Sequence, residues 1–309
     1  MIIVTGGAGF IGSQLIRALN RQSITDILIV DHMGTSTKYM NLTGLNFSDY
    51  IEKDVFIDNL DHIARGASYI FHFGACSNTT ETNGSYMIAN NYAYSKRLIQ
   101  YALNHTIDMI YASSAAVYGL GDNGFSENTS PETPLNSYAV SKWLTDNYTR
   151  RTLQERPANQ ILGLRFFNVF GPGESHKAGM ASVAYHLFEQ VRTTDSIALF
   201  LGSENFKRDF IYITDVIAVI LYFYKHRESG IINCGTGRAQ SFYDMALTLL
   251  EVVNKADATI HYTPFPQHLD GKYQAYTQAD TTLLNLYGFN QTFLNLYTAL
   301  SDYRAYLWT

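Results

Sequence analysis

The sequence predicts an α/β fold in which a doubly wound parallel sheet is joined to a smaller, interleaved α/β lobe. Three observations support this prediction. Short, continuously apolar runs alternate with amphipathic stretches through the first half of the chain, as in a parallel sheet covered by helices on both faces. A glycine-rich turn, GGAGFIG, lies between the first apolar run and the first amphipathic stretch. The length of 309 residues exceeds one ordinary core, so two closely joined lobes are expected.

Strands and helices are expected to alternate regularly up to residue 170. Apolar runs predict strands over residues 1–5, 26–30, 67–73, 107–112 and 161–167. Apolar positions at helical spacing predict helices over residues 11–22, 87–103 and 137–153. The strand over 26–30 ends at Asp31, which places a carboxylate at the carboxyl edge of the expected sheet.

The pattern is looser after residue 170. The stretch GPGESHKAGM at 171–180 is rich in glycine and polar residues, so a loop is expected there. Helices are expected over 181–192, 215–226, 242–254 and at the C-terminus, and strands over 197–200, 208–213 and near Ile260. Residues 230–235 are expected to return to the main sheet. No repeat or long linker separates the two lobes, which indicates that they are interleaved.

Composition and charge exclude several classes of partner and location. The formal net charge is −5 and no basic run occurs, so nucleic acid and anionic membrane surfaces are not expected partners. Two cysteines do not form a disulfide framework, and no metal site is predicted. The chain starts with a strand-like run instead of a signal peptide, and its apolar stretches are too short to span a membrane. A cytoplasmic protein is therefore expected.

The glycine-rich turn predicts a dinucleotide site of the Rossmann type. Gly6, Gly9 and Gly12 allow a tight turn and let a pyrophosphate approach the backbone, where the following helix presents free N–H groups. Asp31 is placed to accept hydrogen bonds from the adenosine ribose, which by itself favours NAD. Lys38 and Lys53 follow and would neutralise a 2′-phosphate, so the motif alone leaves NAD and NADP open.

These patterns define the expected domains. We expect a dinucleotide-binding domain over residues 1–170, with a later return to it near 208–236. Residues 171–207 and 237–309 are expected to form the smaller, substrate-binding domain.

A second motif, YAVSK, places Tyr138 and Lys142 one turn apart on a predicted helix. A nearby ammonium and a bound nicotinamide cation would favour the phenolate of Tyr138, which would then act as a base at neutral pH. Lys142 would also reach the nicotinamide ribose. Ser114 follows a predicted strand, where its hydroxyl would hydrogen-bond a substrate oxygen. The glycine turn, the serine and the YxxxK pair occur in this order along the chain, which favours a catalytic role.

The motifs resemble a known superfamily. GGAGFIG, YASSAAVYG and YAVSK are similar to the extended short-chain dehydrogenases/reductases, which act mainly on nucleotide sugars. Over essentially the whole chain, the sequence further resembles the ADP-L-glycero-D-manno-heptose 6-epimerases. The segments that carry this resemblance are HFGACSNTTE (72–81), NNYAYSK (90–96), RFFNVFGPGESHKAGMASVAYHL (165–187), GSENFKRDFIYITDV (202–216), NCGTGRAQSF (233–242) and GKYQAYTQAD (271–280).

The resemblance implies an isomerase. Such enzymes invert C6 of the heptose in ADP-D-glycero-D-manno-heptose and supply a precursor of the lipopolysaccharide inner core. The C6 proton is not acidic, so the family oxidises C6 transiently with bound NADP, turns the carbonyl in the site and returns hydride to its other face. Tyr138 and Lys177 are the implied proton-handling pair, with Lys142 orienting the cofactor and Ser114 assisting. The family also implies a homo-oligomer, a pentamer.

The resemblance also implies two sets of binding residues. The cofactor contacts would be Gly6, Gly9, Phe10, Ile11, Gly12, Asp31, His32, Lys38, Lys53, Phe73, Gly74, Ala75, Cys76, Ser77, Asn90, Lys142, Val169 and Lys177. The substrate contacts would be Asn168, Gly179, His186, Phe200, Leu201, Gly202, Ser203, Arg208 and Tyr273. Arg208 suits a pyrophosphate, because a guanidinium binds two oxygens at once. The family mostly uses NADP, which favours NADP over NAD here.

Three positions depart from the family pattern. His32 stands where asparagine is expected, Phe73 where glutamate is expected and Gly179 where serine is expected. The alternative functions are another nucleotide-sugar epimerase, a 4,6-dehydratase, or a catalytically silent NADP-sensing or interaction protein. A dehydratase would carry an acidic residue beside Ser114, where alanines follow, and a silent protein would lack Tyr138 or Lys142.

Overall fold

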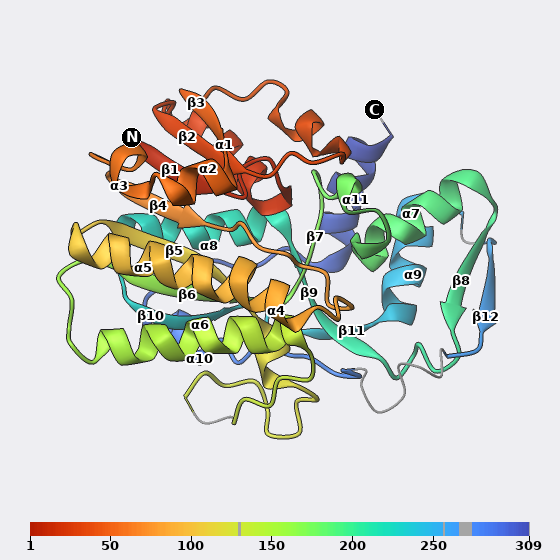
Figure 1. Ribbon diagram of the computed structural model, residues 1–309. Coiled ribbons are helices and arrows are strands. Elements are labelled where there is room, and N and C mark those ends of the chain that lie inside the picture. Colours follow the sequence, from red (N-terminus) through yellow and green to blue (C-terminus); the bar gives the residue numbers. More distant parts are fainter. Residues whose placement is uncertain (129–130, 256, 266–273, 309) are drawn as a thin grey trace. The chain divides into compact units, whose positions relative to one another are not determined.

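The computed structural model describes residues 1–128, 131–255, 257–265 and 274–308, and the chain divides into two compact units (Figure 1). Unit 1 comprises Met1–Val117, Pro134–Phe166 and Ile217–Ile232, and unit 2 comprises Tyr118–Thr133, Phe167–Val216 and Asn233–Thr309. Each unit is discontinuous in sequence. The stretch 118–133, which the sequence analysis placed in the first domain, groups with unit 2, where Tyr118 Oη donates a 2.9 Å hydrogen bond to Asn233 Oδ1.

Unit 1 is built on a seven-stranded sheet in the order β10-β6-β5-β4-β1-β2-β3, with every pair from β6 to β3 parallel. The strands are β1 (Ile2–Thr5), β2 (Ile27–Asp31), β3 (Asp49–Glu52), β4 (Tyr69–His72), β5 (Asp108–Ser114), β6 (Ile161–Phe166) and β10 (Gly230–Cys234). All residues of β1, β2, β4 and β6 are buried, as expected for strands covered on both faces. The predicted doubly wound α/β fold is confirmed.

Helices flank this sheet, with α5 and α6 in front of it and α8 behind it in Figure 1. The helical elements are α1 (Phe10–Arg21), the 3₁₀-helix η1 (Thr37–Leu42), α2 (Lys53–Asp58), α3 (Leu60–Ile63), α4 (Gly84–Met87), the π-helix η2 (Ile88–Ala93), α5 (Tyr94–Asn104), the 3₁₀-helix η3 (Ala115–Tyr118), α6 (Ser137–Leu153) and α8 (Ile213–His226). Buried apolar side chains from α2, α3 and α5 pack against the sheet strands in one hydrophobic core. No helix in the described part of the chain combines the length and apolar character needed to cross a membrane.

The long helix expected over 87–103 is interrupted by the π-helix η2. Asn91 lies inside η2 and is buried, and its side chain forms three hydrogen bonds with two residues outside its own turn. Asn91 Oδ1 accepts from Cys76 N at 2.9 Å, and Nδ2 donates to Cys76 O at 3.0 Å and to Ser141 Oγ at 3.1 Å. π-Turns inside α-helices are frequently found at functional sites.

Unit 2 contains two small sheets and several helices. Strand β9 pairs in parallel with β7 and antiparallel with β11, and β8 pairs in parallel with β12. The elements are β7 (Asn168–Phe170), the 3₁₀-helix η4 (Ser175–Met180), α7 (Val183–Thr193), β8 (Ser196–Phe200), β9 (Lys207–Tyr212), β11 (Ala239–Ser241), α9 (Phe242–Val252), β12 (Thr259–Thr263), α10 (Thr282–Leu286) and α11 (Leu296–Leu307). The expectation that 171–180 is entirely loop is wrong, because η4 forms within it.

Candidate cofactor site and proton-handling residues

The glycine turn after β1 is sterically closed to any other residue at two positions. Gly6 has φ of 70°, and a Cβ atom there would lie 2.6 Å from Gly74 N. A Cβ atom on Gly12 would lie 2.2 Å from Gly6 O. The glycines therefore let the turn pack closely against Gly74 and against the start of α1, whose first residues are Phe10 and Ile11. This is the cradle that a dinucleotide pyrophosphate requires.

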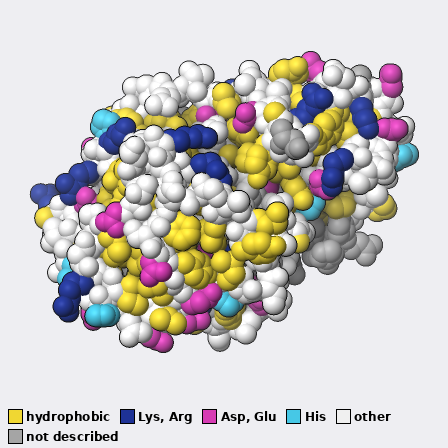
Figure 2. All heavy atoms as spheres, turned by 90° about the horizontal axis from the view of Figure 1, so that it is seen from above, with side chains coloured by type: hydrophobic (Ala, Val, Ile, Leu, Met, Phe, Trp, Pro, Cys, Tyr) yellow, Lys and Arg dark blue, Asp and Glu magenta, His cyan; other side chains and the backbone are white. Residues whose placement is uncertain are grey.

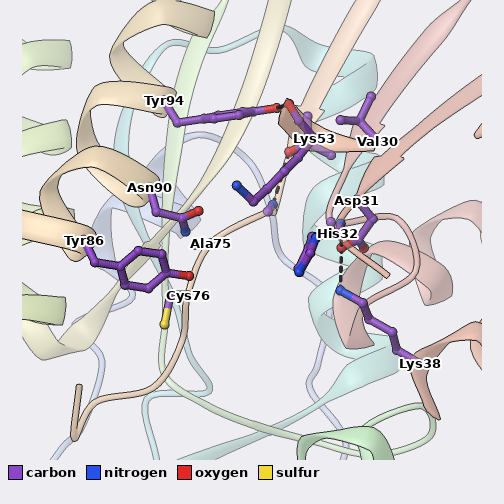
Figure 3. A pocket seen from close by; sticks show the side chains of 13 residues that line it. Val30, Asp31, His32, Lys38, Lys53, Ala75, Cys76, Tyr86, Asn90 and Tyr94 are labelled. Atoms are coloured by element: carbon purple, nitrogen blue, oxygen red, sulfur yellow. Dashed lines mark hydrogen bonds and ion pairs between the residues drawn. The ribbon is translucent and has the colours of Figure 1, made fainter. Parts of the chain in front are cut away.

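A pocket opens in unit 1 beside this turn (Figure 3). Its lining residues are Thr5, Gly6, Val30, Asp31, His32, Lys38, Lys53, Gly74, Ala75, Cys76, Tyr86, Asn90 and Tyr94. Figure 3 shows Tyr86 and Asn90 on one side of the pocket and Asp31, His32 and Lys38 on the other. Many of the residues predicted to contact the cofactor thus lie together at this pocket. They come mainly from strand ends, from the loop after β4 and from the α4–η2 helix.

Four lining residues, Thr5, Val30, Tyr86 and Tyr94, were not predicted from the sequence. Thr5 ends β1, and Val30 is the residue before Asp31 at the end of β2, so their strand positions contained the signal that would have identified them. The two tyrosines come from helical segments whose approach to the pocket depends on tertiary structure.

Asp31 is the centre of a small polar network at the end of β2. The residue is 8% exposed, and Oδ2 accepts a 2.9 Å hydrogen bond from Ala8 N in the glycine turn. Oδ1 accepts from His32 N at 2.7 Å and forms a 2.7 Å ion pair with Lys38 Nζ. Lys53 Nζ instead pairs with Asp54 Oδ1 at 2.6 Å. Asp31, Lys38 and Lys53 therefore line the pocket where the sequence predicts that the adenosine ribose binds.

The remaining predicted cofactor residues do not line the described pocket. Gly9, Phe10, Ile11 and Gly12 belong to the turn and to α1, and Ser77 follows the lining residue Cys76. The ring of Phe73 packs 6.1 Å from the ring of Phe71 and 6.2 Å from the ring of Phe166. Phe73, which departs from the family pattern, is thus part of an aromatic cluster. Val169 lies on β7 and Lys177 in η4, both in unit 2.

Tyr138, Lys142 and Ser114 lie where β5 meets α6. Ser114 ends β5, and Lys142 Nζ donates a 2.7 Å hydrogen bond to Ala112 O on the same strand. Burial lowers the pKa of Lys142 to about 8, and the charge of Asp146 opposes this shift. Burial raises the pKa of Tyr138, whereas a hydrogen bond with Ser114 lowers it. The protein's own groups favour the neutral phenol, so the expected phenolate depends on the charge of a bound nicotinamide.

Lys177 lies in η4 and is half-buried. Burial lowers the pKa of its ammonium group, and the negative charge of Glu174 opposes this shift. A lysine with a lowered pKa is better able to exchange a proton near neutral pH than a solvated one.

Most of the predicted substrate residues are described in unit 2. Asn168 starts β7 and accepts a 3.4 Å hydrogen bond from Thr277 Oγ1, and His186 is half-buried on α7. A Cβ atom added to Gly179 would lie in open space, while Phe200 ends β8 and Leu201 and Gly202 lie in the turn that follows. Ser203 is 2% exposed, and its Oγ has no hydrogen-bond partner among the described residues.

Arg208 lies on β9 with its guanidinium 5.6 Å from the centre of the Phe242 ring. Tyr273 lies outside the described residues.

The sequence model of the NAD dependent epimerase/dehydratase family matches residues 2–235. The chain belongs to this family. Within the family, ADP-L-glycero-D-manno-heptose-6-epimerase of Brachyspira hyodysenteriae is 48% identical to it over 99% of this chain and 98% of that protein. The resemblance to the heptose 6-epimerases that the sequence motifs carry is thereby confirmed.

Solved structures of epimerases have the same fold. The Helicobacter pylori ADP-L-glycero-D-manno-heptose-6-epimerase superposes with a TM-score of 0.86 at 27% identity, covering 100% of this chain and 96% of that one. UDP-glucuronic acid 4-epimerase of Bacillus cereus, in complex with UDP-glucuronic acid and NAD, has a TM-score of 0.84 at 23% identity, covering 99% and 98%. Because only 23% of the residues are identical, the similarity to the Bacillus cereus enzyme shows a shared fold and nothing more.

Proposed function

We propose that this protein inverts C6 of the heptose in ADP-D-glycero-D-manno-heptose to give ADP-L-glycero-D-manno-heptose. The observation that carries the proposal is the 48% identity to a heptose 6-epimerase along nearly the full length of both chains. Ser114, Tyr138, Lys142 and Lys177 are all present in the motifs that resemble that family. The product would serve as a precursor for the lipopolysaccharide inner core.

The pocket of unit 1 supports a bound nicotinamide dinucleotide as cofactor. The glycine cradle at Gly6 and Gly12 fits the pyrophosphate, and Asp31 fits the adenosine ribose. We favour NADP over NAD, because Lys38 and Lys53 both line the pocket and would offset the charge of a 2′-phosphate. A bound nicotinamide supplies a hydride acceptor and afterwards the hydride donor.

Protein side chains handle the proton that accompanies each transfer. As C6 is oxidised, Tyr138 takes the proton of the C6 hydroxyl, while Ser114 donates a hydrogen bond to the same oxygen. Lys142 would orient the cofactor, and the phenolate of Tyr138 would depend on the charge of the bound nicotinamide. After the carbonyl has turned, Lys177 gives a proton to the oxygen as C6 is reduced from its other face. The hydride returns to C6 and the oxygen gains one proton for the one it lost, so no net oxidation occurs. Proton exchange with solvent then returns Tyr138 to the phenolate and Lys177 to the ammonium.

Residues of unit 2 are the proposed contacts to the sugar nucleotide. Arg208 is suited to the pyrophosphate, because its planar fork donates to two oxygens. The hydroxyl of Ser203 is buried without a partner among the described residues, and a substrate oxygen would satisfy it. Asn168, His186 and the turn at 200–203 complete this proposed set.

The proposal includes no nucleic-acid or membrane partner. On the face shown in Figure 2, Lys and Arg side chains are dispersed and lie among Asp and Glu side chains instead of forming one basic patch. The cytoplasmic location and the homo-oligomer, a pentamer by family resemblance, stay predictions from the sequence.

A direct assay tests the proposed function. The purified protein is incubated with ADP-D-glycero-D-manno-heptose, and the two C6 epimers are resolved by chromatography or NMR. We expect interconversion by the wild-type protein and its loss in Tyr138→Phe, which lacks the phenolic oxygen. No interconversion by a protein that retains its cofactor would refute the proposal. Parallel assays with UDP-hexoses test for another nucleotide-sugar epimerase or a 4,6-dehydratase.

A further inference from the structure

Glu174 places a carboxylate inside unit 2, where it accepts four hydrogen bonds. Its side chain is completely buried. Oε1 accepts from Gly171 N at 3.0 Å, from Ser182 Oγ at 2.7 Å and from Tyr303 Oη at 3.1 Å. Oε2 accepts from Ser182 N at 2.5 Å. Four donors on one buried group offset the desolvation of its charge.

These donors lie at both ends of the segment that contains Lys177. Gly171 precedes the segment and Ser182 follows it, so one carboxylate closes residues 171–182 into a compact loop. Inside the loop, Lys177 N donates a 2.9 Å hydrogen bond to the backbone oxygen of Glu174. Ser182 Oγ also accepts from Tyr185 N at 3.2 Å and caps α7, so the same carboxylate holds the start of that helix.

The backbone directly after Lys177 is strained. Ala178 has φ of 47° and ψ of −126°, a conformation that favours glycine and that side chains with a Cβ rarely adopt. Such a conformation persists only where the surrounding structure imposes it. The hydrogen bonds to Glu174 bracket this residue and provide that constraint.

We propose that Glu174 is the positioning residue for Lys177, and that its ionised carboxylate fixes the loop from which the lysine amine acts. This inference rests on the proposed function for the role of Lys177. The loop geometry itself is independent of that function. Glu174 does not touch substrate in this proposal. It acts through the segment that it closes, and its charge also favours the ammonium form of Lys177.

The hydrogen-bond geometry at position 174 requires the carboxylate of Glu and is not satisfied by the isosteric amide of Gln. Each oxygen of Glu174 accepts from a backbone N–H, Oε1 from Gly171 and Oε2 from Ser182. The amide of Gln would place its NH₂ against one of these N–H groups in either orientation. The hydroxyls of Ser182 and Tyr303 are able to rotate, but the two backbone donors are fixed. Glu174→Gln therefore breaks at least one contact that closes the loop.

The first test measures hydrogen–deuterium exchange in the full-length protein with its cofactor bound. In Glu174→Gln, backbone amides within 175–182 should exchange about tenfold faster or more, because a buried hydrogen bond to a charged group is lost. Glu189→Gln is the matched control, because Glu189 lies on α7 and forms only a partly exposed ion pair with Arg192. Unchanged exchange in Glu174→Gln, or the same change in both variants, would overturn the proposal.

The second test separates turnover from binding in the epimerase assay. Glu174→Gln should lower kcat about tenfold or more with KM within about threefold of wild type, because a displaced proton donor affects turnover more than substrate binding. Glu189→Gln should keep both constants. A folded Glu174→Gln protein with wild-type kcat would overturn the proposal.

If Glu174→Gln does not fold, a milder variant tests the same proposal. Tyr303→Phe removes one donor to Glu174 and should accelerate exchange in 175–182 by a smaller factor; no acceleration would count against the proposal. If the wild-type protein produces no C6 epimer, the proposed function fails, while the exchange experiment still decides whether Glu174 holds the loop.

Discussion

Asp146 and Arg165 form an ion pair that is completely buried in unit 1. Arg165 Nε donates to Asp146 Oδ2 at 2.9 Å, and both side chains are 0% exposed. Asp146 also accepts from Tyr111 Oη at 3.0 Å and from Ser113 Oγ at 2.9 Å, so it joins α6 to β5 and β6. The same carboxylate favours the charged form of Lys142, one turn earlier on α6. The pair therefore supports the helix that carries the proposed base.

Removing one partner of this pair should strongly destabilise the protein. Asp146→Asn removes the negative charge that faces the buried guanidinium of Arg165, and breaking a buried ion pair in this way typically costs about 3–5 kcal/mol of the free energy of unfolding. Urea denaturation followed by circular dichroism measures the loss. The paired replacement Asp146→Leu with Arg165→Met should be less destabilising than Asp146→Asn alone. A loss below about 1 kcal/mol in Asp146→Asn would contradict the role assigned to the pair.

The sequence predicts much of unit 1 because its signals are local. The apolar runs that become β1, β2, β4 and β6 are readable without tertiary information, and so are the glycines of the turn. Strand β3 was not predicted, because Asp49–Glu52 is polar and partly exposed and pairs only along one edge. The π-helix η2 depends on the bonds from Asn91 to Cys76 and Ser141, which are distant in sequence.

The same distinction applies to the candidate site. Asp31, Lys38 and Gly6 were predicted from short motifs, and the structure places all three at one pocket. Tyr86 and Tyr94 were missed, since a tyrosine on a helix does not reveal which surface it faces. Closure of the 171–182 loop by Glu174 was also missed, because one of its donors comes from Tyr303 on α11.

The buried amine of Lys142 should make stability depend on pH. Its pKa is lowered from 10.5 to about 8 in the folded protein, so between these values the unfolded chain binds more protons at this group. The contribution of Lys142 to the free energy of unfolding therefore rises with pH, by about 2 kcal/mol between pH 7.5 and 10. Urea denaturation of wild type and Lys142→Met at both pH values isolates this group. A difference between the two proteins that stays constant with pH would contradict the lowered pKa.

Lys38 should control the preference for NADP. Its amine lies 2.7 Å from Asp31 Oδ1 and neutralises that carboxylate. In Lys38→Ala the negative charge of Asp31 is left to repel a 2′-phosphate, so the Kd for NADP should rise about tenfold or more, which is about 1.4 kcal/mol. The Kd for NAD should change by less than about threefold. Isothermal titration calorimetry of the cofactor-free protein measures both constants.

The control for this experiment is Lys225→Ala, which removes an exposed lysine on α8 that does not line the pocket. Equal weakening of NADP and NAD in Lys38→Ala would show that the lysine does not select for the phosphate.

Gly12→Ala should disrupt the turn that precedes α1. The added methyl group would lie 2.2 Å from Gly6 O, a backbone atom that cannot turn aside as the end of a flexible side chain can. Overpacking of this kind costs about 1–3 kcal/mol, and movement of the turn should also abolish cofactor binding. Gly84→Ala is the control, because no atom lies within 4 Å of its added methyl group and α4 accepts alanine readily. Thermal denaturation with and without NADP compares the two variants; a Gly12→Ala protein that binds NADP normally would contradict the steric argument.

Lys177→Ala should separate cofactor binding from epimerisation. The residue lies in η4 and is not among the residues that line the described pocket, so removal of its amine should leave NADP affinity and the melting temperature close to wild type. Epimerisation should nevertheless fall about 100-fold or more, because general acid–base groups contribute factors of that size and the turned carbonyl loses its proton donor. Product formation from either C6 epimer measures this loss. Turnover within about threefold of wild type would remove Lys177 from the mechanism and leave Tyr138 to handle the proton in both poses.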